Sequence, residues 1–130
     1  MKTNRVLLID DDINTHKIVA ASLKDTDWEL ESAMSADEGL FKVRNQSHIA
    51  VMVDYQMPDV NGLEVIEKIR NEIHLKDIPL LLISSDDLPS NILAKLNSLS
   101  TVFFTKNYLF KQNLPAKLKG FIDYYDSQQS

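Results

Sequence analysis

Two runs of this sequence are apolar at every position, and they restrict the fold more than any other feature. They cover residues 49–53 and 80–83. A strand with one face in water alternates apolar and polar residues, whereas a strand covered by helices on both faces does not. Both runs have the length of a strand and are far too short to span a bilayer. They therefore predict central strands of a parallel sheet lying between two layers of helices.

Runs of strand length recur along the whole chain, each followed by a segment suited to a helix. They lie at residues 6–9, 28–33, 49–53, 78–83 and 102–105. This βα repeat predicts an α/β fold, a five-stranded parallel doubly wound sheet of the flavodoxin-like order 2-1-3-4-5 with helices on both faces. In that order the first and third strands are neighbours, and a crevice opens beyond their carboxyl ends. We expect one domain over residues 1–126 and a polar tail over residues 127–130.

Local signals mark the expected helices. Ser35 and Glu38 have the spacing of a capping box at the start of a helix over residues 36–45. Asp12 is expected to cap the helix after the first strand, and Asn113 the final helix. One apolar stripe is formed by Leu63, Ile66, Ile69 and Ile73. The three histidines, His16, His48 and His74, share no spacing and are interpreted as surface or capping residues.

Composition excludes several classes of function. The 130 residues include 14 Lys and Arg against 19 Asp and Glu, a net charge of −5. With no cluster of basic residues, direct binding to nucleic acid or to an anionic membrane is not expected. The absence of cysteine excludes thiol catalysis and cysteine-ligated zinc. No apolar run is long enough to span a membrane, so a cytoplasmic location is expected.

Acidic residues end two strands that the topology makes neighbours. Residues 10–12 are all aspartate after the first strand, and Asp54 follows the third. Two like charges about 4 Å apart repel by about 4 kcal/mol at an effective dielectric of 20, so a cation is expected among them. Oxygen ligands favour Mg²⁺. Ser84 and Lys106 end the fourth and fifth strands, and a carboxylate placed among these groups could attack phosphorus.

These residues resemble a known family, the receiver domain of bacterial two-component response regulators, as in chemotaxis regulators. The resemblance rests on residues 6–12, 53–62, 83–84 and 105–106 and covers about residues 4–126. Its most specific element is Asp-x-x-Met-Pro-x-x-x-Gly, which begins at Asp54. The family has the strand order deduced above.

The resemblance implies a phosphorelay function. Asp54 matches the phosphoacceptor, which takes a phosphoryl group from a phosphohistidine on a sensor histidine kinase or a histidine phosphotransfer protein. Asp10 and Asp11 match the acid pair that holds Mg²⁺ together with Asp54, Asp11 directly and Asp10 mainly through water. Gln56 would offer its backbone carbonyl to the same ion. The domain would be a signalling module with at most slow self-phosphatase activity, not an enzyme.

The resemblance also implies a switch and an output face. Lys106 matches the lysine that pairs with the acceptor carboxylate and then with the phosphoryl oxygens. Ser84 and Phe103 match the hydroxyl and the aromatic residue that move on phosphorylation. A downstream protein, or a second copy in a phosphorylation-dependent dimer, would bind the fourth helix, fifth strand and fifth helix of the family. Here that face would include Asn91, Lys95, Phe103, Tyr108 and Lys111.

Three features of the sequence depart from the family pattern. Asn107 replaces a proline that usually follows a cis peptide bond, and a non-proline cis bond costs roughly 3–4 kcal/mol. We therefore expect a trans bond and a different direction for the Lys106 ammonium. Residues 99–101 read Leu-Ser-Thr where small residues are usual, which predicts altered packing of the preceding helix. Phe103 lacks the hydroxyl of the common tyrosine.

Two other functions remain open from the sequence. A pseudo-receiver would bind its partner without phosphorylation, and Asn107 favours it. A phosphatase of the haloacid-dehalogenase type would use Asp10-x-Asp12 as nucleophile and acid. Asn14 stands where that motif prefers Thr or Val, no cap domain is expected, and Asp54 would have no role. An FMN carrier is disfavoured because the acidic loop would repel a phosphate. The chain could stand alone or be cut from a longer regulator.

Overall fold

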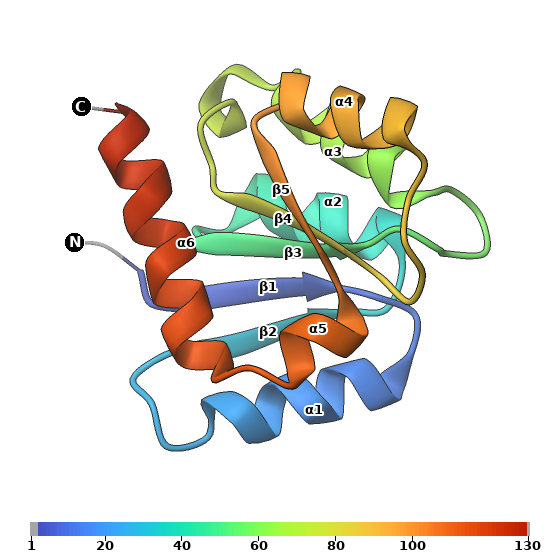
Figure 1. The fold of residues 1–130 in the computed structure, drawn as a ribbon. Coiled ribbons are helices and arrows are strands. Elements are labelled where there is room, and N and C mark those ends of the chain that lie inside the picture. The colour runs from blue at the N-terminus through green and yellow to red at the C-terminus, as the bar shows by residue number, and fades with distance from the viewer. Residues whose placement is uncertain (1–2, 130) are drawn as a thin grey trace.

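The computed structural model describes residues 3–129 and contains the predicted five-stranded parallel sheet (Figure 1). The strand order is β2-β1-β3-β4-β5, and all four strand pairs are parallel, so the predicted fold class is confirmed. The strands are β1 (Arg5–Ile9), β2 (Glu29–Ala33), β3 (Ala50–Asp54), β4 (Leu80–Ser84) and β5 (Thr101–Thr105).

Helices cover both faces of the sheet. The helical elements are α1 (Ile13–Leu23), α2 (Ala36–Asn45), α3 (Gly62–Arg70), η1 (Ile73–Leu75), α4 (Ser90–Ser98), α5 (Lys106–Phe110) and α6 (Leu114–Gln129). In Figure 1, α1, α5 and α6 cover the face turned to the viewer, and α2, α3 and α4 cover the other. Among residues 3–129, none of the helices has the length and the run of apolar residues that a bilayer-spanning segment needs.

The core consists of two apolar layers, one on each face of the sheet. On β1, Leu7 and Ile9 pack into the layer beneath α2, α3 and α4. Val6 and Leu8, which alternate with them along the strand, pack into the layer beneath α1 and α6. The residues of β3 alternate in the same way. A central strand must therefore be apolar at every position, which explains the uninterrupted apolar runs.

Helix starts are capped where the sequence predicts. The Ser35 hydroxyl accepts a hydrogen bond from the Glu38 backbone N–H at 3.1 Å, and the Glu38 carboxylate accepts one from the Met34 N–H at 2.5 Å. At the start of α6, the Asn113 side chain accepts from the Ala116 N–H at 3.1 Å. The Ser35 and Asn113 contacts satisfy backbone donors that the first turn leaves free, and the Glu38 contact satisfies the N–H of the residue before the N-cap.

Some local expectations were wrong. The stripe ending at Ile73 was wrong, because α3 ends at Arg70 and Ile73 lies in η1 with 86% of its surface exposed. His16 and His48, expected at the surface, are buried, whereas His74 is exposed. Of the expected polar tail, residues 127–129 continue α6, and residue 130 lies outside the described residues, as do residues 1–2 of the expected domain.

Arg70 ties the end of α3 to three other parts of the chain. Its guanidinium donates hydrogen bonds to the carbonyls of Lys76, Ile78, Leu99 and Ser100 and to the Tyr125 hydroxyl, at 2.6–3.1 Å. These partners lie before β4, at the end of α4 and on α6. Ser100 has a φ of 52°, so this turn adopts a left-handed conformation that a non-glycine residue rarely takes.

Replacing Arg70 with lysine should destabilise the fold. A lysine ammonium cannot bond five acceptors in the geometry of the planar guanidinium, and the partly buried carbonyls left unpaired should lower the free energy of unfolding by about 2–4 kcal/mol. Urea denaturation measures this. Arg44→Lys is the matched control, because Arg44 is an exposed partner of Glu72 and should cost under about 1 kcal/mol. Equal losses in the two variants would contradict the role of Arg70.

Candidate functional site

Three carboxylates meet at the carboxyl ends of β1 and β3. Asp10 and Asp11 follow β1, and Asp54 is the last residue of β3. Each offers one oxygen, and these oxygen atoms all lie within 4.8 Å of one another. Asp10 and Asp54 are buried, whereas Asp11 is exposed. The site is thus enclosed by the sheet on one side and accessible from the other.

Lys106 reaches into this cluster from the first position of α5. Its Nζ lies 2.8 Å from Asp10 Oδ2 and 3.4 Å from Asp54 Oδ1. The ammonium also donates to the Thr15 hydroxyl at 3.2 Å. No peptide bond within residues 3–129 is cis, so the Lys106–Asn107 bond is trans, as Asn107 predicts. The lysine therefore lies nearer to Asp10 than to Asp54.

Burial and crowding shift the pKa values of these groups. Burial, and then the nearby charge of Asp10, raise the pKa of Asp54 to about 6, although Lys106 opposes the rise. Burial alone would lower the pKa of Lys106, but its contacts with Asp10 and Asp54 outweigh burial and raise it. Burial and the neighbouring carboxylates together therefore outweigh the stabilisation that Lys106 gives to the ionised Asp54.

The donor set fits a Mg²⁺ ion. Asp10, Asp11 and Asp54 supply three negative charges when ionised, and Lys106 supplies one positive charge. The remaining two negative charges are those that a divalent cation would balance. All the donors are oxygens, which hard cations prefer. The exposed position of Asp11 leaves room for the water molecules that Mg²⁺ usually retains.

The start of α3 packs directly against the backbone of Asp54. A Cβ at Gly62 would collide with the Asp54 carbonyl oxygen and would lie 2.7 Å from Leu82 Cδ1. The Gly62 N–H donates to the Tyr55 carbonyl at 2.8 Å, which closes the turn that carries the exposed Gln56. Only glycine allows this close approach, which explains the glycine in the motif that begins at Asp54.

The other predicted residues lie at or near the same edge of the sheet. Ser84 ends β4, is fully buried, and accepts a hydrogen bond from the Asp86 N–H at 3.2 Å. Phe103 lies on β5, partly buried against the layer beneath α2, α3 and α4. Lys106 contacts Asp10 and Asp54 directly, and Asp11 has an oxygen within 4.8 Å of theirs. Ser84, Gln56 and Phe103 are assigned to the site only by their positions in the chain.

Sequence reasoning missed two residues in the first turn of α1. Thr15 is buried and bonds Lys106, and His16 is buried with its Nε2 2.7 Å from the Asp10 carbonyl oxygen. The available signal was their place in a helical stripe with the buried Val19 and Leu23. Asp12 is exposed and caps α1 by accepting from the Asn14 N–H at 2.9 Å, as predicted.

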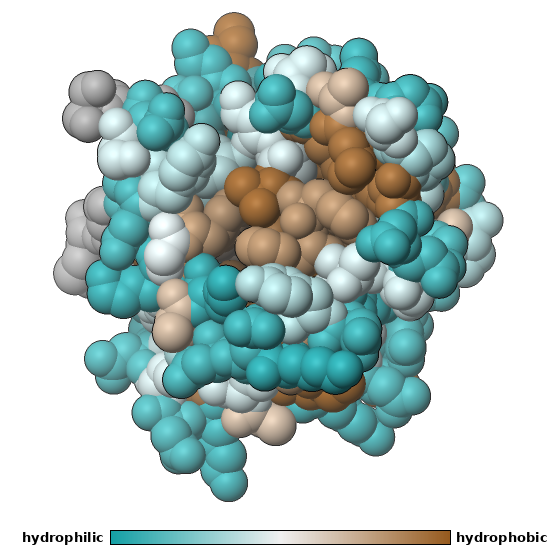
Figure 2. Space-filling model, in the orientation of Figure 1, coloured by the Kyte–Doolittle hydropathy of each residue, from teal (hydrophilic) through white to brown (hydrophobic). Residues whose placement is uncertain are grey.

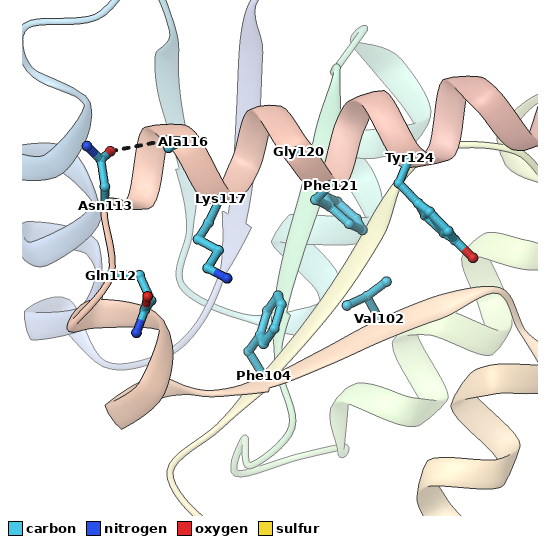
Figure 3. A pocket seen from close by; sticks show the side chains of 9 residues that line it. All are labelled: Val102, Phe104, Gln112, Asn113, Ala116, Lys117, Gly120, Phe121 and Tyr124. Carbon is cyan, nitrogen blue, oxygen red and sulfur yellow. Dashed lines mark hydrogen bonds between the residues drawn. The ribbon is translucent and has the colours of Figure 1, made fainter.

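An apolar groove lies between β5 and α6, on the face shown in Figure 2. It has a volume of about 610 Å³ and is lined by Val102, Phe104, Gln112, Asn113, Ala116, Lys117, Gly120, Phe121 and Tyr124 (Figure 3). The Lys117 ammonium lies 5.2 Å from the centre of the Tyr108 ring. Two residues of the predicted output face, Tyr108 and Lys111, belong to the short helix α5 and its C-cap.

Comparisons with known proteins agree with this geometry. The family model for the response regulator receiver domain matches residues 6–119. The chain is 27% identical over 119 residues to the transcriptional regulatory protein TrcR of Mycobacterium tuberculosis, covering 91% of this chain and 45% of TrcR. It is 24% identical over 117 residues to the chemotaxis protein CheY1 of Helicobacter pylori, covering 88% of this chain and 90% of CheY1.

Solved structures show the same fold. The CheY-like receiver domain protein of Methanospirillum hungatei superposes with a TM-score of 0.84 at 22% identity, over 98% of this chain and 99% of that one. The chain spans about half the length of several of the curated relatives it matches.

Substituting Gly62 with alanine should destabilise the fold, because the new methyl group must displace the Asp54 backbone. We expect the free energy of unfolding to fall by about 2 kcal/mol. Gly120→Ala is the matched control, because a Cβ there would meet nothing within 4 Å. Within α6 that change should stabilise the fold by up to about 1 kcal/mol. Urea denaturation of both variants checks this, and a stabilising Gly62→Ala would contradict the close approach.

Stability without divalent cations should depend on the charge of Asp54. Its pKa is about 6 in the fold against 3.8 ordinarily, so the folded chain holds this proton more tightly. The stabilisation is complete below pH 3.8 and is lost as the pH rises through 6. Asp54→Asn should therefore exceed wild type in free energy of unfolding by up to about 3 kcal/mol at pH 8, and by much less near pH 4.

Urea denaturation in EDTA at several pH values measures this difference. Asp59→Asn is the control, because Asp59 is an exposed acid in the same turn. A constant difference between Asp54→Asn and wild type across this pH range would show that Asp54 titrates normally.

Proposed function

Because the chain belongs to the response regulator receiver domain family, we propose that it is a phosphorylation-controlled signalling module with Asp54 as its phosphoacceptor. Receiver domains are signalling domains rather than enzymes, and they act with sensor kinases and downstream targets in two-component systems. The observation that supports this role is the cluster of Asp10, Asp11 and Asp54 with the Lys106 ammonium among them. The phosphoryl donor would be a phosphohistidine on a sensor histidine kinase or a phosphotransfer protein.

The reaction requires little beyond positioning and neutralisation of charge. An Asp54 carboxylate oxygen attacks phosphorus, an O–P bond forms, and the N–P bond breaks with its electron pair returning to the imidazole. A bound Mg²⁺ would neutralise charge on the phosphoryl oxygens. With a pKa of about 6, Asp54 is mostly ionised near neutral pH and can serve as the nucleophile.

The surrounding residues would hold the reacting groups. Asp10 and Asp11 would bind Mg²⁺ with Asp54, and the Gln56 backbone carbonyl would complete the protein ligands. Lys106 lies 3.4 Å from Asp54 and would pair with the phosphoryl oxygens after transfer. These roles explain why the site has one cation of its own and an excess of carboxylates.

The output would be a change in protein binding. Ser84 would turn its hydroxyl toward the phosphoryl group, and Phe103 would follow by a change of rotamer. Phe103 lies on β5 and packs into the apolar layer beneath α2, α3 and α4, on the opposite sheet face from the groove, so its motion would alter the face formed by α4 and β5. A downstream protein, or a second copy of the chain, would bind there.

Incubation with acetyl phosphate and Mg²⁺ should add a single phosphoryl group, measured as intact mass. The adduct should be absent in EDTA and in Asp54→Asn, because both the cation and the nucleophile are required. Asp59→Asn, which changes an exposed acid in the same turn, should be labelled like wild type. An unlabelled wild type, under conditions that label a control receiver, would reject the phosphoacceptor role and favour a pseudo-receiver. Labelling of Asp54→Asn would show that a residue other than Asp54 accepts the phosphoryl group.

A further inference from the structure

We propose that His16 is a positioning residue, which fixes the backbone of Asp10 so that Asp10 and Asp11 present their carboxylates to Mg²⁺. The proposal rests on the function proposed above and adds a residue that the receiver resemblance does not assign. The buried imidazole of His16 joins α1, β1 and β2 through its two hydrogen bonds.

The backbone and side chain of Asp10 are held on several sides. Its N–H donates to the Ala33 carbonyl at 3.0 Å, and its Oδ1 accepts from the Asp12 N–H at 2.9 Å. Its carbonyl oxygen lies 2.7 Å from His16 Nε2. This carbonyl belongs to the peptide group that joins Asp10 to Asp11. Its orientation is therefore coupled to the backbone dihedral angles of both residues, from which their carboxylates extend.

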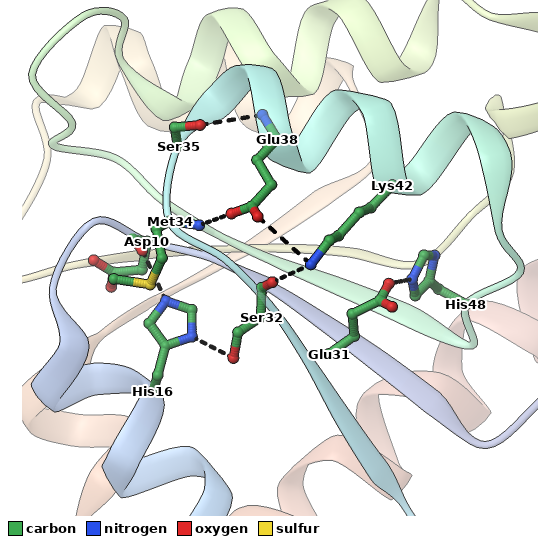
Figure 4. Close-up of polar contacts among 9 residues, drawn as sticks. All are labelled: Asp10, His16, Glu31, Ser32, Met34, Ser35, Glu38, Lys42 and His48. Carbon is green, nitrogen blue, oxygen red and sulfur yellow. Dashed lines mark hydrogen bonds and ion pairs between the residues drawn. The ribbon is translucent and has the colours of Figure 1, made fainter.

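The hydrogen-bond partners of the His16 ring define which of its nitrogens donates. A carbonyl oxygen can only accept, so Nε2 carries the hydrogen and donates it to Asp10. Nδ1 lies 2.8 Å from the Ser32 hydroxyl, which donates to it when the ring is neutral. Figure 4 shows the resulting chain from Ser32 through His16 to Asp10. Both ring nitrogens are thus satisfied.

The far end of this chain is also fixed. The Ser32 carbonyl accepts a hydrogen bond from Lys42 Nζ at 2.6 Å, and Lys42 pairs with Glu38 at 3.7 Å. Ser32 lies on β2 and Lys42 on α2, so the imidazole is anchored to the body of the fold. A rotation of the Asp10 carbonyl would break this arrangement.

Packing alone does not explain a histidine at this position. His16 is 4% exposed and lies in the buried stripe of α1 with Val19 and Leu23, where an apolar residue would fill the space. Burying a polar ring is unfavourable unless its hydrogen bonds are made, and both bonds here lead to the polar edge of the sheet. His48 is comparably buried, but its Nε2 pairs with Glu31, and it lies at the amino end of β3. It is a natural control.

The test measures Mg²⁺ binding by calorimetric titration, in parallel with urea denaturation. His16→Met removes both hydrogen bonds and should weaken Mg²⁺ binding about tenfold or more, the range for residues that orient metal ligands. His16→Gln can place an amide N–H near the position of Nε2 and should restore binding to within about threefold of wild type. His48→Met should lower stability yet change the Mg²⁺ dissociation constant by less than about twofold.

Two further measurements keep the proposal falsifiable if His16→Met does not fold. Ser32→Ala leaves the imidazole in place but removes its anchor, and should weaken Mg²⁺ binding by about threefold. Two-bond ¹H–¹⁵N spectra of wild type should show His16 protonated on Nε2. Unchanged Mg²⁺ affinity in His16→Met, or in Ser32→Ala where the former does not fold, would overturn the positioning role. So would a ring that carries its hydrogen on Nδ1 alone, because Nε2 could then not donate to Asp10. The role would also be overturned if His48→Met lost as much Mg²⁺ affinity as His16→Met, because the loss would then only reflect reduced stability.

Failure of the proposed function would look different. If wild type itself bound no Mg²⁺, the metal site would be rejected, and the positioning role with it. If wild type bound Mg²⁺ and Asp11→Asn abolished binding while His16→Met matched wild type, only the positioning role would be rejected.

Discussion

Repulsion among three carboxylates at the ends of β1 and β3 is the constraint on which the site depends. The strand order makes these ends neighbours, so the chain cannot form its sheet without bringing Asp10 and Asp54 together. Lys106 relieves part of the repulsion, but the pKa of Asp54 still rises to about 6, with burial as the larger cause. In the function proposed here, this preformed cluster of charges would bind a divalent cation and then a phosphoryl group with little reorganisation.

Backbone contacts, rather than side-chain contacts alone, hold the acidic residues in place. The start of α3 packs against the Asp54 carbonyl through Gly62, and the first turn of α1 bonds the Asp10 carbonyl through His16. One contact requires the smallest residue, and the other requires a hydrogen-bond donor. Both place a helix start against the peptide group of a site residue. The two strands that supply the carboxylates are therefore fixed at the point where the chain leaves the sheet.

The sequence allowed prediction of the features that depend on local pattern. Alternation, or its absence, predicted the strands, and capping spacings predicted the starts of α2 and α6. The meeting of the acidic residues followed from topology. The burial of His16 could not be predicted in this way. Sequence spacing alone does not show whether a polar ring in a helix is buried or exposed, because its hydrogen-bond partners lie on other elements. The prediction for Ile73 was wrong because its spacing continues the apolar stripe although the helix has already ended. The helix α3 ends at Arg70, whose guanidinium bonds carbonyls of distant segments.

The helix α5, which the sequence did not predict, connects the acid cluster to the surroundings of the groove between β5 and α6. Its first residue is Lys106, and Tyr108 lies two positions later in the same five-residue helix. The Tyr108 hydroxyl accepts a hydrogen bond from Lys117 Nζ at 3.0 Å, and its ring stacks on Phe104 at 5.4 Å. Thr105 caps this helix by accepting from the Tyr108 N–H at 3.2 Å, so Lys106 and Tyr108 belong to one short rigid element. A lysine in an extended loop could change partners without moving its neighbours. A lysine in the first turn of a capped helix changes partners either through its own rotamers or by moving a helix that carries an aromatic residue beside the groove.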